Sequence, residues 1–183
     1  RILHTSDWHL GRSFGPMSLD ADQRAFLDWL VDLCVAERIH LVAVAGDLYD
    51  RAIPPVEAVA LFRDTLRRLL ERGVQVAAIT GNHDSPDRVA AYGDLLDLSG
   101  IRLRGGYDRF GEVLTVDGPD GPLDLVLLPF LDPQAAPDDV VDATVASDDD
   151  LVERRIRRTH QSVLEAAVAA ARPRLRAPRS LVL

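Results

Sequence analysis

Apolar runs and amphipathic stretches alternate along the first hundred residues. Short apolar runs rich in β-branched residues predict strands at 2–5, 41–45, 74–80 and 101–103. Longer stretches with apolar residues at helical spacing predict helices at about 21–38, from Pro54-Pro55 to Gly73, and at about 86–98. Strands that alternate with helices in this way pair in parallel through right-handed crossovers. The expected fold class is therefore α/β.

The pattern changes after these elements. Two further apolar stretches, 112–116 and 123–128, flank a turn cluster of Asp, Gly and Pro and predict an antiparallel hairpin. A long helix is expected over about 151–171, with His160 packed on its apolar face, and a last apolar strand begins at residue 180. The arginines within 154–158 lie off that face, where either a solvated surface or a track for DNA would explain them.

Polar residues follow three of the predicted strands. The three stretches are Ser6-Asp7-Trp8-His9, Gly46-Asp47-Leu48-Tyr49-Asp50 and Gly81-Asn82-His83-Asp84. The carboxyl ends of parallel strands form one edge of a sheet, so we expect these side chains to converge there. Asp7 and His9 are two residues apart and would point the same way from extended backbone. A carboxylate together with an imidazole suits borderline divalent metals such as Mn, Fe and Zn.

Each of these polar residues also has a structural explanation. An aspartate at a strand–helix junction is often only a cap, which explains Asp47 equally well. Asn82 could be only a left-handed turn residue, and Asp50 could cap the following helix. Asp84 is expected to be structural.

The composition is that of a globular protein. Of the 183 residues, 47% are hydrophobic and 27% are charged, and no apolar run approaches the roughly 20 residues of a membrane span. The chain enters its first strand without a signal peptide, so we expect a cytoplasmic location. Cys34 is the only cysteine, which excludes an internal disulfide, and we expect it to be buried. The net charge of −8 argues against strong unaided binding to nucleic acid.

The three polar motifs resemble a known family. Asp-x-His, Gly-Asp-x-x-Asp and Gly-Asn-His-Asp follow strands in this order, about 40 and 35 residues apart, as in the calcineurin-like metallophosphoesterases. The stretches 4–12, 45–51 and 80–86 are similar to those of SbcD-type nuclease subunits of the bacterial SbcC–SbcD exonucleases. This resemblance implies a layered α/β/β/α sandwich with mixed sheets. It also implies that residues 1–183 belong to one nuclease domain.

The resemblance assigns roles to six residues. It implies two divalent ions, most readily Mn²⁺, with Mg²⁺, Fe²⁺ and Zn²⁺ as alternatives. Asp7 and His9 resemble ligands of one ion, Asp47 the carboxylate that bridges both, and Asn82 a ligand of the second. His83 resembles the catalytic histidine, and Asp50 the residue that orients it. If two such ions bind, the carboxylates of Asp7 and Asp47 lie within about 8 Å of each other.

One part of the family pattern is missing. The family completes its metal sites with a further histidine and a Gly-His-x-His motif, whereas the only histidines after Asn82 are His83 and His160. We therefore expect the remaining ligands to lie beyond Leu183. The domain would then be incomplete at its C-terminal end, and the chain as it stands weak or inactive.

The resemblance implies a function, and two alternatives stay open beside it. The expected function is metal-dependent hydrolysis of DNA phosphodiesters by an exo- or endonuclease subunit that processes double-strand breaks and hairpins in DNA repair and recombination. An SbcC-like ATPase partner and a homodimer are implied. The first alternative is a phosphoesterase for nucleotides, phosphoproteins or other small phosphoesters. The second is a non-catalytic scaffold for dimerisation or partner docking.

Overall fold

The computed structural model describes residues 1–142 and 158–183 of the chain. Contacts divide the chain into two compact units, Arg1–Gly105 and Gly106–Leu183. The single nuclease domain expected over residues 1–183 stays a prediction beside this division, and so does the stacking of four layers. Within the described residues, no helix combines the length and the apolar character that crossing a bilayer requires.

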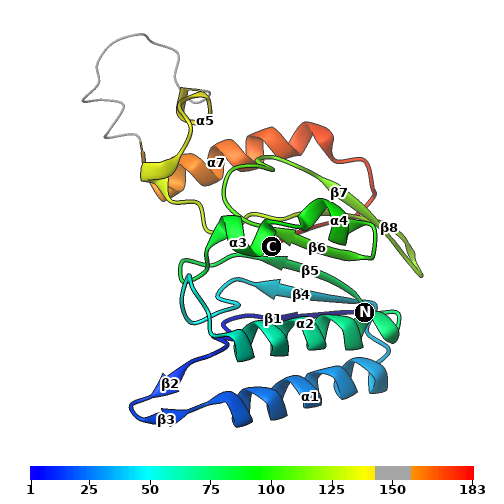
Figure 1. The fold of residues 1–183 in the computed structure, drawn as a ribbon. Helices are drawn as coiled ribbons and strands as arrows, with labels where there is room; N and C mark the ends of the chain where they lie inside the picture. The colour runs from blue at the N-terminus through cyan, green and yellow to red at the C-terminus, as the bar shows by residue number, and fades with distance from the viewer. Residues whose placement is uncertain (143–157) are drawn as a thin grey trace. The chain divides into compact units, whose positions relative to one another are not determined.

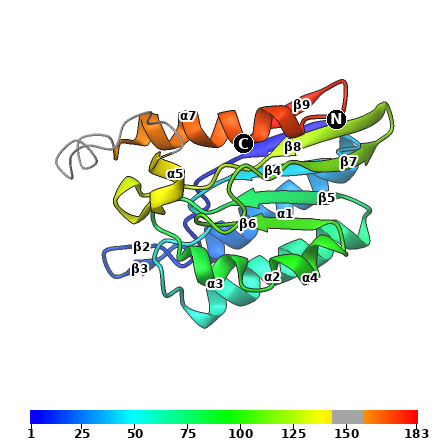
Figure 2. The ribbon, with the colours of Figure 1, turned by 90° about the horizontal axis from the view of Figure 1, so that it is seen from above.

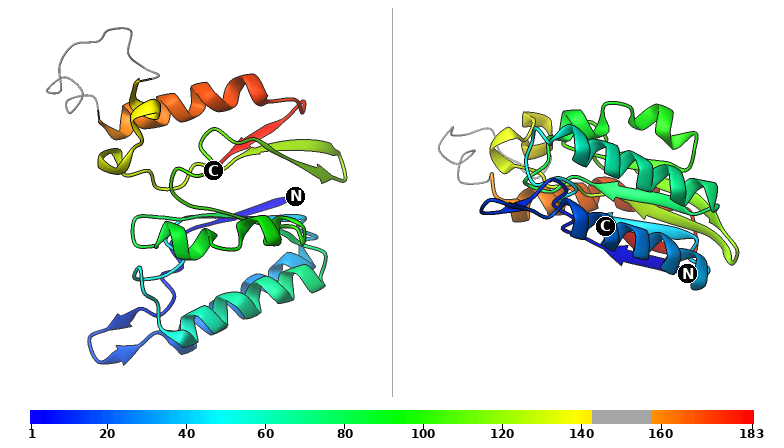
Figure 3. Two further views of the ribbon diagram at one scale, coloured as in Figure 1. Left: turned by 45° about the horizontal axis from the view of Figure 1, so that its top comes forward. Right: turned by 60° about the horizontal axis from the view of Figure 1, so that its bottom comes forward.

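A parallel sheet forms the centre of the first unit (Figure 1). Its strands, in the order β1-β4-β5-β6, are Ile2–Thr5, Leu41–Ala45, Gln75–Ile79 and Ile101–Arg104. All three neighbouring pairs are parallel, and the register aligns the carboxyl ends of β1, β4 and β5. Helices α1 (Asp20–Ala36) and α2 (Val56–Glu71) lie side by side along one face (Figures 1 and 3). The expected α/β fold class is confirmed.

The apolar faces of α1 and α2 bury most of the residues that their spacing predicts. Leu30 and Cys34 are buried in α1, and burial raises the pKa of the Cys34 thiol. Phe26 and Val59, which share the helical spacing of the buried apolar residues, are 39% and 43% exposed. Phe26 tilts toward the exposed Trp29 instead, and Val59 lines an apolar groove beside α2 rather than the sheet. Both residues therefore lie at the margin of their helix's buried face.

The helix expected over 86–98 is two short helices. They are α3 (Pro86–Ala90) and α4 (Gly93–Asp97). Tyr92 leaves the helical conformation at φ −117°, and a Cβ on Gly93 would lie only 3.2 Å from the carbonyl oxygen of Leu103 in β6. Arg104 of β6 then binds Asp97 through two hydrogen bonds of 3.1 and 2.7 Å. Close packing of α4 against β6 accounts for the break.

The second unit contains a mixed three-stranded sheet. Strand β7 (Leu114–Gly118) pairs antiparallel with β8 (Gly121–Val126), and β9 (Ser180–Val182) pairs parallel with β8. The expected hairpin and last strand are thus present, with a turn at Pro119-Asp120. Helix α7 (His160–Ala171) runs over one face of this sheet (Figure 2).

The remaining described elements are short. In the first unit they are the hairpin strands β2 (Ser13–Phe14) and β3 (Met17–Ser18), and in the second unit η1 (Pro133–Ala135), α5 (Asp138–Asp142) and η2 (Arg172–Arg174).

Helix α7 begins later than the spacing predicted. Thr159 has extended backbone and caps the helix through a reciprocal pair of hydrogen bonds with Ser162. His160 was expected to be packed, but it is exposed in the first turn, with its ring centroid 5.6 Å from that of Phe130. Residues 151–157, with three of the clustered arginines, lie outside the described part of the chain.

Arg158 is neither a solvated surface residue nor an available DNA contact. Its guanidinium donates to the carbonyl oxygens of Pro133 and Ala136 and pairs with Asp138 at 2.7 Å. These contacts tie the segment before α7 to η1 and to the start of α5. For this member of the arginine cluster, the structure replaces both sequence-based explanations with an internal one.

A buried aspartate holds the C-terminal segment of the second unit against its sheet. Asp124 in β8 accepts hydrogen bonds from the Thr115 hydroxyl at 2.7 Å and from the backbone N–H groups of Arg176 and Ala177. These hydrogen bonds, first of all that from Thr115, lower the pKa of the Asp124 carboxyl. The carboxylate form is therefore the one that the fold stabilises.

The stability of the second unit should fall in acid because of Asp124. A carboxyl group whose pKa is lowered by folding stabilises the fold above its unfolded pKa of about 3.9 and loses this contribution as pH falls through the folded pKa. We expect Asp124→Asn to lower stability at neutral pH and to flatten the loss between neutral pH and about pH 3. Urea unfolding followed by circular dichroism measures both. Asp120→Asn, in the exposed hairpin turn, is the control, and equal pH dependence in Asp124→Asn and the wild type would contradict the prediction.

Candidate metal centre

Main-chain hydrogen bonds hold the first two polar motifs side by side. The N–H groups of Asp7, His9 and Leu10 donate to the carbonyl oxygens of Gly46, Asp47 and Leu48, at 3.1, 2.9 and 3.0 Å. These bonds continue the pairing of β1 with β4 beyond the ends of both strands. The first two motifs therefore leave the sheet as one paired segment.

Asp84 joins the third motif to the second. Its buried carboxylate accepts hydrogen bonds from the N–H groups of Leu48, Tyr49 and Gly81, at 3.0, 2.9 and 2.8 Å. Burial raises the pKa of this carboxyl, and the three N–H donors oppose that effect. The structural role expected for Asp84 is confirmed.

Glycine is required where these two loops meet. A Cβ on Gly81 would lie 2.0 Å from Oδ1 and 2.4 Å from the backbone N of Asp47. Gly46 adopts φ +83°, and a Cβ there would lie 3.0 Å from Cα of Gly81. The loops thus approach more closely than any side chain at Gly81 allows, and the Asp47 carboxylate lies directly against the third motif.

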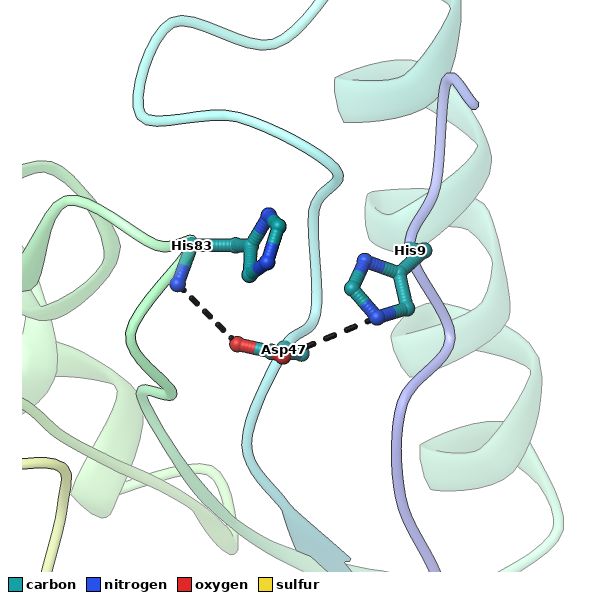
Figure 4. Close-up of side chains that lie close together, drawn as sticks. All are labelled: His9, Asp47 and His83. Atoms are coloured by element: carbon teal, nitrogen blue, oxygen red, sulfur yellow. Dashed lines mark hydrogen bonds and ion pairs between the residues drawn. The ribbon is translucent and has the colours of Figure 1, made fainter. Parts of the chain in front are cut away.

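The carboxylates and imidazoles of the three loops form one cluster. Nε2 of His9 lies 3.6 Å from Oδ2 of Asp47 and 3.8 Å from Oδ1 of Asp7. Those two carboxylate oxygens can be no farther apart than the sum of these distances, which is inside the limit of about 8 Å for a two-metal site. Single ligand atoms of His9, Asp47 and His83 all lie within 4.8 Å of one another (Figure 4). These contacts bring together four of the six residues singled out in the sequence, and a fifth, Asp50, places its carboxylate 3.5 Å from Nδ1 of His9.

Three of these residues have strained backbone. Asp7, His9 and Asp47 adopt left-handed conformations at φ 56°, 43° and 48°, which cost a non-glycine residue of the order of 1 kcal/mol or more. The other described non-glycine residue with positive φ, Arg38, follows the end of α1, where a left-handed residue is common. Strain is therefore concentrated at the cluster, as at many functional sites.

The cluster fits a divalent cation. Protein ligands bind such ions at about 2.0–2.2 Å, so ligand atoms of one ion lie within roughly 4 Å of each other. Nε2 of His9 lies within this distance of one oxygen of Asp47 and one oxygen of Asp7. Nδ1 of His9 is buried and makes no hydrogen bond with the described residues, although Oδ1 of Asp50 lies 3.5 Å away. Two carboxylates and an imidazole together suit Mn²⁺, Fe²⁺ or Zn²⁺.

Asp50 contacts His83 through its main chain rather than its side chain. Nδ1 of His83 lies 3.0 Å from the carbonyl oxygen of Asp50, which can only accept, so this nitrogen carries the proton. The Asp50 carboxylate instead lies 3.5 Å from Nδ1 of His9 and 3.7 Å from Nη1 of Arg12. The family motif alone did not reveal which group of Asp50 faces which histidine.

Asn82 is exposed beside the cluster. The N–H of the next residue, His83, donates to Oδ1 of Asp47 at 3.1 Å, so the main chain at this point faces the bridging candidate (Figure 4). The His9 and His83 rings meet edge to face, with centroids 4.8 Å apart. The role of Asn82 as a ligand stays a prediction.

Comparison with known proteins identifies the family. The family model described as calcineurin-like phosphoesterase matches residues 1–161. The chain belongs to this family. Calcineurin-like phosphoesterases are metal-dependent hydrolases, which agrees with the donor set of the cluster. The resemblance inferred from the three motifs is confirmed.

The chain is also similar to curated SbcD proteins, which are subunits of the nuclease SbcCD. It is 34% identical over 135 residues to the SbcD protein of Escherichia coli (strain K12), covering 73% of this chain and 34% of that protein. For the SbcD protein of Bacillus subtilis (strain 168) the identity is 42% over 106 residues, 57% of this chain and 27% of the relative. For that of Rhodobacter capsulatus it is 35% over 135 residues, 72% and 31%. The chain therefore spans about a third of the length of these relatives, or less.

Removing the Asp84 carboxylate should destabilise the first unit. Asp84→Ala leaves three buried N–H groups without their acceptor, and we expect a loss of about 3 kcal/mol or more. Asp84→Asn keeps one acceptor oxygen and should cost less. Urea unfolding of the metal-free protein measures both, with Asp87→Ala on exposed α3 as the control. If both Asp84 variants lose less than about 0.5 kcal/mol of unfolding free energy, the stabilising role of Asp84 is contradicted, because surface substitutions cost that little.

Removing the Asp50 side chain should weaken metal binding more than it impairs proton transfer by His83. Asp50→Ala keeps the carbonyl that holds His83 but removes the carboxylate beside His9. We expect about tenfold weaker binding of Mn²⁺, as for other outer contacts of metal-ligating histidines. Calorimetric titration with Mn²⁺ measures this, again beside Asp87→Ala. If Mn²⁺ affinity is unchanged but hydrolysis at saturating Mn²⁺ is lost, this prediction is contradicted. The Asp50 carboxylate would then orient His83, as the family resemblance implies.

Proposed function

We propose that this protein hydrolyses phosphodiester bonds of DNA with the help of divalent metal ions. The observation that carries this proposal is the cluster of Asp7, His9, Asp47 and His83 at the carboxyl edge of a parallel sheet. Its strained, hydrogen-bonded loops hold carboxylate and imidazole groups close together before any ion binds. The similarity to SbcD proteins supports a nuclease over other phosphoesterases.

The proposal assigns two ions, Mn²⁺ in the first place, to the candidate ligands. Asp7 and His9 would hold one ion, Asp47 both, and Asn82 the second. When bound, such ions shield the phosphate charge and lower the pKa of a water molecule for attack. The protein holds these side chains in place through the main-chain hydrogen bonds between the first two loops and through the bonds from backbone N–H groups to the Asp84 carboxylate.

His83 is the proposed proton donor to the leaving sugar oxygen. Its Nδ1–H is held by the Asp50 carbonyl at 3.0 Å, which leaves Nε2 to carry and release the transferred proton. The residue is exposed, so a phosphodiester can reach it. The contact with Asp50 fixes the orientation of the ring while that exchange takes place.

DNA binding in this proposal depends on partners. The chain carries a net charge of −8, so neutralisation of DNA phosphates has to come largely from elsewhere. We assign that task to an SbcC-like ATPase and to a second copy of this chain, in the processing of breaks and hairpins during DNA repair and recombination. For a DNA substrate, the proposed location is the cytoplasm.

A phosphoesterase for small substrates is the second candidate function. The family match supports it directly, because the match specifies phosphoester hydrolysis without a nucleic acid. The same ligands would serve nucleotides, phosphoproteins or other small phosphoesters. The two functions differ in whether a diester or a monoester is the preferred substrate.

A substrate comparison tests the proposed function. With Mn²⁺, we expect weak but measurable cleavage of linear DNA and of bis-p-nitrophenyl phosphate, still less cleavage of p-nitrophenyl phosphate, and no activity after addition of a chelator. A preference for the monoester would favour the second function. Bound Mn²⁺ without hydrolysis of any of the three would favour a non-catalytic scaffold.

Replacing His83 should separate chemistry from metal binding. We expect His83→Ala to keep Mn²⁺ binding and to lose hydrolysis by about a hundredfold or more, as for removal of a general acid. Calorimetry and DNA cleavage are measured on the same preparation, with the exposed His160→Ala as the control. Loss of Mn²⁺ binding would make His83 a ligand, because its ring also lies within the cluster.

A further inference from the structure

Gln23 reaches from the first turn of α1 to the main chain of the loop after β1. Its Nε2 donates to the carbonyl oxygens of His9 at 2.7 Å and Trp8 at 3.3 Å, and its Oε1 accepts from the N–H of Gly11 at 3.0 Å. Carbonyl oxygens only accept and a backbone N–H only donates, so one orientation of the amide satisfies all three contacts. The side chain is thus matched to this loop at every polar atom.

The loop that Gln23 contacts includes His9 of the cluster and has left-handed backbone at two positions. His9 has a left-handed backbone at φ 43°, and Gly11 follows at φ 85°. On one flank, main-chain bonds to Asp47 and Leu48 hold the loop. On the other flank lie the three contacts of Gln23. Left-handed residues persist where several contacts hold them in place. Gln23 adds three such contacts to the main-chain bonds of the loop, which include that from the N–H of Arg12 to the carbonyl oxygen of His9.

The neighbours of His9 in the chain explain why this turn decides where the imidazole points. Trp8 and Leu10 are 5% and 1% exposed, and both belong to the core of the first unit. His9, between them, turns its ring to the opposite side, where Nε2 meets the carboxylates of Asp7 and Asp47. A relaxed backbone at His9 would rotate the ring away from these carboxylates while the two anchors stay buried.

We propose that Gln23 is a positioning residue that holds the left-handed turn at His9, so that the imidazole is ready to bind a divalent cation beside Asp7 and Asp47. The inference rests on the proposed metal-dependent function. The rival explanation is that Gln23 only satisfies polar groups of a loop and contributes to stability. The two differ in one quantity, because only a positioning role changes the affinity for the ion in a protein that remains folded.

Gln23→Met tests this on the whole protein, because methionine has a similar length and no polar amide. Gln161→Met, at an exposed position of α7, is the matched control. We expect Mn²⁺ binding, measured by calorimetry, to weaken about tenfold or more, as when other contacts that orient a ligand are removed. Hydrogen exchange of the Gly11 amide should accelerate in the metal-free protein, because its acceptor is gone. Neither change is expected in Gln161→Met.

Wild-type Mn²⁺ affinity in a folded Gln23→Met protein would overturn the proposal, even if the melting temperature fell. If Gln23→Met does not fold, Gln23→Glu keeps the acceptor for Gly11 and removes both donors. Its added negative charge would by itself strengthen cation binding, so weaker binding supports the proposal and equal or tighter binding overturns it. If the wild-type protein binds no Mn²⁺, the proposed function fails. The exchange rates of the His9 and Leu10 amides, which bond to Asp47 and Leu48 and not to Gln23, then decide separately whether Gln23 holds the turn.

Discussion

One buried carboxylate, that of Asp84, holds the arrangement on which the site depends. Three N–H groups from two loops converge on it, and these donors offset part of the cost of burying a charge. The raised pKa of the group reflects the part that they do not offset. In return, the third loop is drawn against the second until only glycine fits at position 81. The contact between Asp47 and the main chain of His83 follows directly from that approach.

Main-chain hydrogen bonds also hold the candidate ligands in unfavourable backbone conformations. Asp7, His9 and Asp47 are left-handed, yet each takes part in hydrogen bonds that extend the strand ladder or join the loops. A loop held in this way presents its donor atoms without first having to be ordered. Metal binding to such a site costs little conformational entropy, at the expense of stability in the protein without metal.

The two histidines of the cluster have different hydrogen-bonding and charged neighbours, and these neighbours favour different chemical roles. Nε2 of His9 faces two carboxylates, which suits a ligand. His83 is exposed and anchored through Nδ1 to a carbonyl, which suits a group that exchanges protons with a substrate. Asp50 serves both rings, one through its carboxylate and the other through its main chain. A substitution at Asp50 therefore reports on His9 more directly than on His83.

Patterns along the chain were enough to predict the parallel strand–helix succession, the hairpin and the three polar motifs. These depend on local periodicity and on the rule that parallel strands end at one edge, so short stretches of chain suffice to recognise them. Three-dimensional contacts were needed to show which group of Asp50 faces which histidine, that Gln23 contacts the His9 loop, and that Tyr92-Gly93 interrupts a helix. They were also needed to show that α7 begins after Thr159, which leaves His160 exposed. Most of these outcomes depend on distances between residues far apart in the chain, and periodicity along the sequence carries no information about such distances.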